Sequence, residues 1–371
     1  MDTPNVTSAA PGMGPDMNNP APSSFLLAFQ QWFSGVHGYA SIIVCAFGIC
    51  TNVFNITILS RRDMRTATNL FLCGLAFSDI LTMMPYMPFA IHFYCIHDPA
   101  EVSPEKYTEG WATFMLISVN LAATTHTISI WLGVSLSVFR FMQMRTPVRG
   151  PQAKQRSIQQ VKAVTLVVYV ASTLAMVPNY LTNKIERVDI GNTSLYGLRD
   201  LKLATNETEP IAFANVISYA ILAKLVPCAL MVIFGGSLLY SVGIKGKKRR
   251  RRLSSTNSNC KREVRQSKTT RMLLVVMILF LVTEFPQGIL ILASALVSGF
   301  YHNVYMPLGD LMDFIALVNN AINFVLYCIM SQQFRQRFID MYLKRTSRLK
   351  HFEKISLNNQ SFTRTIVTDA S

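Results

Sequence analysis

The sequence predicts an all-α membrane protein: a seven-transmembrane helix bundle followed by a short amphipathic eighth helix. Half of the residues are hydrophobic and only 15% are charged, whereas soluble domains carry about 25% charged residues. Seven apolar stretches reach the length of roughly 20 residues that a membrane helix needs. The connectors between these stretches alternate between basic and non-basic, as they do in proteins that cross a membrane repeatedly.

The seven spans are expected near residues 36–60, 67–95, 111–142, 161–181, 211–243, 270–298 and 304–330. The resulting organisation is an N-terminal tail over 1–35, the bundle over 36–331, an amphipathic helix over 332–345 and a C-terminal tail over 346–371. The N-terminal tail is too polar and proline-rich for a cleaved signal peptide. We therefore expect the first helix to act as its own insertion signal.

The distribution of charge predicts the orientation of the chain. Residues 1–60 contain no Lys or Arg, while the first, third and fifth connectors and the C-terminal tail hold most of the 35 basic residues. Basic connectors stay in the cytoplasm, so the N-terminus is expected outside the cell. The net charge of +15 then suits contact with anionic membrane lipids, most clearly at the basic run 247–252. We expect no binding to nucleic acid.

Three glycosylation sequons agree with this orientation. Asn5, Asn192 and Asn206 each begin an Asn-X-Ser/Thr motif, and all three fall in segments expected outside the cell. Glycosylation of these residues is therefore expected.

The segment 319–338 predicts the amphipathic helix and a polar bundle interior. Asparagine is costly in an apolar helix unless it meets other polar groups, which Asn319, Asn320 and Asn323 would do inside a bundle. Phe334 and Phe338 follow at a spacing of four residues with arginines between them. A helix with this pattern lies along the cytoplasmic membrane surface.

Three charged residues, Asp79, Lys224 and Glu284, are expected near the middle of spans. A charge at that depth costs roughly 2.5–3.5 kcal/mol, so each residue needs a partner or a function. Two arrangements are open for Glu284. It either pairs with Lys224 in a contact that rearranges on activation, or it is neutral and bonds His126 or Asn319 while Lys224 faces a pocket.

Acidic residues also mark the outer half of the seventh span. Asp310 and Asp313 lie on one helix face, and the helical period from Asn323 turns Asp313 toward the bundle. The acidic connector before the third span would help to steer a cationic ligand inward. The residues expected to contact a ligand are Asp313, Asp310, His126, Glu284, Gln287, Lys224 and His92.

Residues along nearly the whole membrane region resemble the motifs of rhodopsin-like (class A) G-protein-coupled receptors. They are Asn52, Leu75-Ala76 with Asp79, Arg140, Pro227, Pro286, and Asn323 with Tyr327. The resemblance implies an activation switch formed by Arg140, Glu284, Pro286, Asn323 and Tyr327. It also implies a candidate sodium site at Asp79, Ser129, Asn319, Asn320 and Asn323, the alternative being a hydrated polar network without an ion.

Departures from the class pattern indicate a particular group of receptors within the class. Phe139 stands where the class has an acid before its Arg, and Glu284 stands where it has a Trp. Together with the segments 126–132, 178–181, 224–228 and 283–288, these features resemble invertebrate myosuppressin-type receptors for FMRFamide-related neuropeptides. The resemblance implies a plasma-membrane receptor for amidated Arg-Phe-amide peptides that activates heterotrimeric G proteins. Class analogy adds a receptor kinase and arrestin as partners of the Ser/Thr-rich tail, and a same-fold receptor for a lipid or other small molecule is the alternative.

The cysteine pattern predicts that the usual disulfide of the class is absent. The third-span position that carries its first cysteine is Met115, and residues 182–210 contain no Cys. Both halves of the bridge are therefore missing together.

Other functional classes fit less well. An opsin needs a lysine within 304–330, which contains none, and a transporter would show internal repeats. The six histidines are scattered without the spacing of metal ligands. We therefore expect no enzyme activity and no cofactor other than the candidate sodium ion.

Overall fold

The computed structural model describes residues 23–146, 150–190, 193–199, 203, 209–250 and 258–344, without the side chains of 190, 242–250, 258–269 and 272. Seven helices in these ranges are long and apolar enough to cross a membrane. The predicted all-α membrane fold is thus confirmed. The predicted glycosylation sites Asn5, Asn192 and Asn206 and the tail 346–371 lie outside the described residues, as do the side chains of the basic run 247–252.

The first three spans begin at residues whose side chains cap them. They are formed by α1 (Ser24–Leu59), α2 (Ala67–Ala90) with its wider π-helical continuation η1 (Ile91–Ile96), and α3 (Glu109–Arg145). The side chains of Ser23, Thr66 and Thr108 each accept a hydrogen bond from a backbone N–H of the first turn. The cap at Ser23 starts α1 well before the expected residue 36.

The last four spans contain most of the helix breaks and π-helical turns of the described spans. The fourth combines α4 (Pro151–Ala175) and α5 (Val177–Thr182), and the fifth combines α6 (Pro210–Ser218), η2 (Tyr219–Leu225) and α7 (Val226–Arg250). The sixth is α8 (Ser258–Leu296), and the seventh is η3 (Tyr301–Tyr305) with α9 (Met306–Met330). The π-helical turns of η2 directly precede Pro227, whose missing N–H interrupts regular helical bonding.

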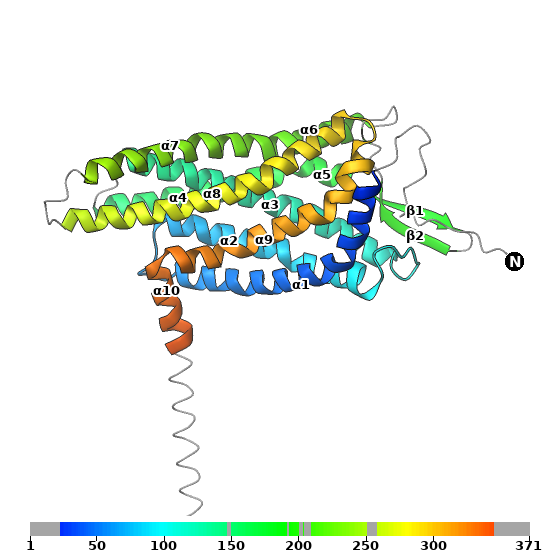
Figure 1. Ribbon diagram of the computed structural model, residues 1–371, viewed down its shortest axis with the longest axis horizontal. Coiled ribbons are helices and arrows are strands. Elements are labelled where there is room, and N and C mark those ends of the chain that lie inside the picture. Colours follow the sequence, from blue (N-terminus) through cyan, green and yellow to red (C-terminus); the bar gives the residue numbers. More distant parts are fainter. Residues whose placement is uncertain are drawn as a thin grey trace, which may run out of the picture.

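A β-hairpin that the sequence analysis did not predict lies at one end of the bundle, opposite α10 (Gln332–Phe338) (Figure 1). Its antiparallel strands are β1 (Ile185–Ile190) and β2 (Thr193–Leu198). We call this end of the bundle the hairpin end and the other the α10 end. The buried polar residues lie at different positions along the axis that joins these two ends.

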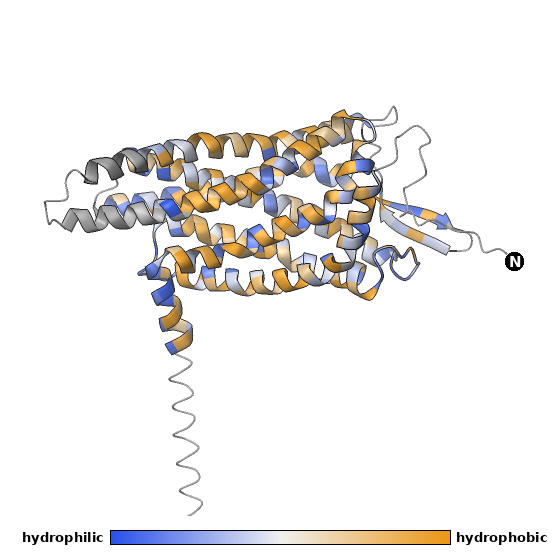
Figure 2. Ribbon diagram, viewed as in Figure 1, coloured by the Kyte–Doolittle hydropathy of each residue, from blue (hydrophilic) through white to orange (hydrophobic). Residues whose placement is uncertain are grey.

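The amphipathic segment α10, with η4 (Ile339–Leu343), leaves the bundle and shows apolar and polar residues along one short helix (Figure 2). Phe334 is 1% exposed and packs edge-on against Tyr327, with ring centroids 5.6 Å apart. Phe338 packs on Phe54 of α1, and Arg337 pairs with Asp63 at 2.6 Å. Aromatic packing therefore fixes this helix to both α1 and α9.

All cysteines whose side chains the structure describes are free: Cys45, Cys50, Cys73, Cys95, Cys228 and Cys328. The hairpin contributes none, so no disulfide joins it to α3 within the described part of the chain.

We expect a mild reductant to leave the Tm of the purified protein unchanged, because the described fold contains no disulfide to break. Thermal unfolding with and without reductant measures this. A drop of several degrees on reduction would contradict the free state of these cysteines.

Candidate functional site

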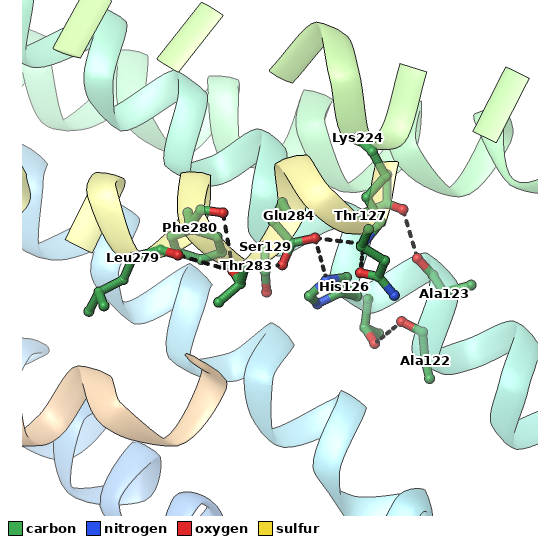
Figure 3. A network of polar contacts seen from close by, with 12 residues as sticks. Ala122, Ala123, His126, Thr127, Ser129, Lys224, Leu279, Phe280, Thr283 and Glu284 are labelled. Atoms are coloured by element: carbon green, nitrogen blue, oxygen red, sulfur yellow. Dashed lines mark hydrogen bonds and ion pairs between the residues drawn. The ribbon is translucent and has the colours of Figure 1, made fainter. Parts of the chain in front are cut away.

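A cluster of buried ions lies between α3, η2 and α8 (Figure 3). The Lys224 ammonium donates to Glu284 Oε2 at 2.6 Å and to Gln287 Oε1 at 2.8 Å. His126 Nε2 lies 3.0 Å from the same Glu284 oxygen. The structure therefore brings together Glu284 with both Lys224 and His126. Asn319, the other partner considered for Glu284, has no hydrogen bond from its side-chain nitrogen to any described residue.

The local sequence brings these side chains close together. Lys224 lies in the wider turns of η2 before Pro227, and Glu284 precedes Pro286, which lies inside α8. Gly288 faces Lys224 one turn beyond Glu284. A Cβ added at Gly288 would lie 2.9 Å from the Cβ of Lys224. The absence of a side chain at Gly288 thus permits the close approach of η2 and α8.

Burying the charges of Lys224 and Glu284 costs free energy. The side chains of Lys224 and Glu284 are each 1% exposed. Removing both charges from water costs several kcal/mol per ion, which only a close, well hydrogen-bonded partner can offset. The contacts with Gln287 and His126 supply these additional bonds. Any movement of α8 relative to η2 must therefore keep this cluster intact or replace its partners.

A second polar network surrounds Asp79, nearer the middle of the bundle. The Asp79 carboxylate accepts hydrogen bonds from Ser129 at 2.9 Å and from Asn323 at 3.1 Å. Ser129 also contacts Ser78, at 3.0 Å. Three of the five candidate sodium residues thus converge, whereas no hydrogen bond joins the side chains of Asn319 and Asn320 to Asp79.

The donor set around Asp79 fits a sodium ion. Carboxylate, hydroxyl and amide oxygens are the ligands that hard cations prefer. Asp79 is fully buried, and the side-chain oxygen of Asn320 is a buried acceptor with no hydrogen bond in the described structure. These residues could hold the ion and would otherwise need water to satisfy them.

At the α10 end, Arg140 is buried without an acidic partner among the described side chains. Its guanidinium donates to Thr270 at 3.1 Å and to Gln143 at 3.3 Å. The neighbouring Phe139 packs edge-on against Phe71 instead, with ring centroids 5.6 Å apart. Neutral side chains alone therefore restrain Arg140 in this conformation.

The two acids of α9 differ in their surroundings. Asp310 accepts a hydrogen bond of 2.6 Å from the Tyr94 hydroxyl. Asp313 is exposed, and it makes no hydrogen bond or ion pair with any residue that the structure describes. Tyr219 and Tyr305 lie within electrostatic range of its carboxylate. Asp313 is thus an exposed carboxylate without a hydrogen-bond or ion-pair partner among the described residues.

His92 is the remaining residue that the sequence predicted to contact a ligand. It packs against the connector before α3. Its ring stacks on Trp111 with centroids 3.7 Å apart, and its Nε2 lies 3.0 Å from the Lys106 carbonyl. The Lys106 ammonium donates to the Asp98 and Pro99 carbonyls at 2.7 and 3.1 Å, and burial lowers its pKa. The structure places His92 in support of this connector, and ligand contact by His92 stays a prediction.

Sequence reasoning missed several partners. It did not identify Tyr94 as the donor to Asp310, nor Ser78 beside Ser129. It also missed a set of asparagines near the hairpin, including Asn120, although the cost of asparagine in an apolar helix was a usable signal.

The chain matches the model of a known protein family over most of its length. The family model described as "Serpentine type 7TM GPCR chemoreceptor Srw" matches residues 39–345. The G-protein coupled receptor dmsr-1 of Caenorhabditis elegans is 26% identical over 90% of this chain and 73% of its own length. The sex peptide receptor of Drosophila melanogaster is 25% identical over 84% of this chain and 73% of its own length.

A solved structure shows the same fold. Squid rhodopsin matches with a TM-score of 0.61 at 14% identity, covering 84% of this chain and 86% of its own.

We expect Lys224→Met and Glu284→Gln each to lower the free energy of unfolding by about 3–5 kcal/mol, because each leaves a buried charge without its partner. The double variant should lose clearly less than the sum of the two single losses. Thermal or chemical unfolding in detergent measures this, with Gln287→Leu as the control that removes a neutral acceptor. Fully additive losses would show that the two side chains are not coupled.

Proposed function

Because the chain belongs to the Srw family of serpentine seven-transmembrane G-protein-coupled chemoreceptors, we propose that it is a plasma-membrane receptor for extracellular peptides ending in Arg-Phe-amide. The proposal includes activation of heterotrimeric G proteins. The sex peptide receptor is named for a peptide, which supports a peptide ligand here. The hairpin end then faces outside and the α10 end faces the cytoplasm, in accord with the basic connectors.

The observation that carries the proposed ligand chemistry is the free carboxylate of Asp313. Glu284 is occupied by Lys224 and His126, and Asp310 is occupied by Tyr94. Asp313 has no such partner in the described structure. A guanidinium pairs with a carboxylate and stacks on aromatic faces, and Tyr219 and Tyr305 lie within electrostatic range of the Asp313 carboxylate. This arrangement favours an arginine-containing ligand.

Activation would begin at the ion cluster below Asp313. Lys224 lies within electrostatic range of Asp313, so a cation bound there changes the field at the Lys224–Glu284 pair. Rearrangement of that pair would move α8 about Pro286. The polar network of Asp79 and Asn323 would carry the change toward Tyr327 and Arg140, where the G protein binds.

The cytoplasmic face would serve further partners. The amphipathic α10 would lie on the inner membrane surface, with Arg335 and Arg337 near anionic lipid headgroups. A receptor kinase and arrestin would act on the Ser/Thr-rich tail after activation.

A bound sodium ion at Asp79 forms part of the proposal. Ser129, Asn319, Asn320 and Asn323 would share the ion with the carboxylate. The ion would supply positive charge that stabilises buried Asp79 in the inactive conformation.

We expect Asp313→Asn to reduce the potency of an Arg-Phe-amide peptide at least tenfold, since a loss of about 1.4 kcal/mol corresponds to that factor. The matched control Asp310→Asn should have a smaller effect, because Asp310 already has a tyrosine donor. Calcium or cAMP responses at equal surface expression give the potencies.

Replacing the arginine of the peptide by citrulline should cause a similar loss in the wild type and little further loss in Asp313→Asn. Fully additive losses would refute the pairing. No response to any peptide of an amidated panel, with a response to a lipid, would overturn the proposed ligand class.

We expect Phe139→Asp to lower basal signalling, because the new carboxylate gives Arg140 the ionic restraint that it lacks in this structure. The control Phe139→Asn tests the loss of the ring without adding charge. The measurement is the basal second-messenger level at equal surface expression. Equal levels in wild type and Phe139→Asp would argue against the restraint.

We expect sodium to weaken agonist binding relative to a bulky organic cation at equal ionic strength, because sodium stabilises the inactive conformation. Asp79→Asn should abolish this difference. Competition binding in the two salts provides the measurement, and a sodium effect retained in the variant would place the ion elsewhere.

A further inference from the structure

Four asparagine side chains join three spans near the base of the hairpin. Asn120 of α3 accepts, at Oδ1, hydrogen bonds from Asn179 at 3.0 Å and Asn183 at 2.8 Å. Asn179 in turn accepts from Asn215 of α6 at 3.2 Å, and Asn215 also donates to Thr182 at 2.9 Å. We call Asn120, Asn179, Asn183 and Asn215 the asparagine cluster.

The surroundings make this cluster hard to break. Asn120 is 3% exposed and Asn215 is 6% exposed. A buried amide without a partner is costly, and Asn179 and Asn183 are half-buried. The Tyr180 hydroxyl adds a contact at 3.0 Å to Thr124 of α3. Each member therefore holds the others in one geometry.

The asparagine cluster lies next to the start of the hairpin. Asn183 immediately follows α5, and β1 begins at Ile185. On the far strand, Tyr196 N–H donates to the Tyr107 carbonyl at 3.0 Å, just before α3 begins. Hydrogen bonds thus join the segment just before β1 to α3, and β2 to the connector just before α3. The described cysteines are free and contribute no covalent link.

We propose that the asparagine cluster is a positioning device that fixes the hairpin over the hairpin end of the bundle, in the role that a disulfide to the third span would otherwise fill. Asn120 is its centre, because its side-chain oxygen accepts from Asn179 of α5 and from Asn183, which lies between α5 and β1. The inference goes beyond the proposed function, since it concerns the placement of the hairpin whatever ligand enters below it.

A cysteine pair reports the position of the hairpin without any ligand. The backbone bond between Tyr107 and Tyr196 places the two residues within the range of Cα separations that a disulfide spans, about 4.4–6.8 Å. The reporter carries Tyr107→Cys and Tyr196→Cys, with Cys95→Ser to remove the described thiol at that end. A protease site inserted at 147–149 splits the chain between the cysteines, so a non-reducing gel measures the cross-linked fraction.

Two substitutions of the same asparagine separate the hydrogen bonds from the packing. Asn120→Asp keeps an oxygen that accepts both donors, and it should cross-link as the reporter does. Asn120→Leu removes the acceptor and should lower the initial cross-linking rate by at least about threefold, as expected for the loss of two hydrogen bonds. Asn69→Leu, at the α10 end, is the matched control and should leave the rate unchanged.

Equal cross-linking rates in Asn120→Leu and Asn120→Asp would overturn the proposal. If Asn120→Leu does not reach the membrane, Asn183→Ala removes one donor at the root of the hairpin and must slow cross-linking in its place. A rate unchanged in Asn183→Ala would then overturn the proposal in the same way.

A stability measurement separates positioning from general packing. The oxidised cysteine pair should restore most of the Tm that Asn120→Leu loses, and reductant should abolish the restoration. Failure of the disulfide to restore Tm would show that the asparagines act only on helix packing and would contradict the assigned role.

Discussion

Burying Lys224 and Glu284 in an apolar bundle constrains three of its spans at once. Their atoms lie 2.6 Å apart, and His126 and Gln287 complete the contacts. Pro227 and Pro286 lie near the two charges, and Gly288 permits the close approach of the helices that carry them. Because an unpaired charge is so costly there, small relative shifts of η2 and α8 are strongly opposed unless a new partner appears.

This constraint explains how the polar interior is divided along the bundle. Glu284 and Asp310 already have partners, which leaves Asp313 accessible at the hairpin end. Toward the α10 end, Asp79 and Arg140 have only neutral hydrogen-bond partners among the described side chains. A ligand acting near Asp313 would therefore meet a rigid cluster first, with more adaptable groups beyond it. Two discrete arrangements of such a cluster are what a switch requires.

The sequence predicted the elements whose physical signal is local. Apolar length located the seven spans, and the cost of a buried charge identified Glu284 as a residue in need of a partner. That rule could not choose between Lys224 and His126, and the structure contains both contacts. Asp310 and Tyr94 are 216 residues apart, so no local pattern could join them. The hairpin was missed because its strands are short and mixed in polarity, and because its contacts with Asn120 and Tyr107 are distant in the sequence.

The contacts of Glu284 are those of an ionised partner of Lys224 rather than of a neutral carboxylic acid. Infrared spectroscopy of the ligand-free protein distinguishes the two, because only a protonated carboxyl group gives a high-frequency C=O band. We expect Glu284→Gln to remove intensity from the carboxylate region and to leave the protonated-carboxyl region unchanged. Loss of a protonated-carboxyl band in Glu284→Gln would show instead that Glu284 is neutral and does not form an ion pair with Lys224.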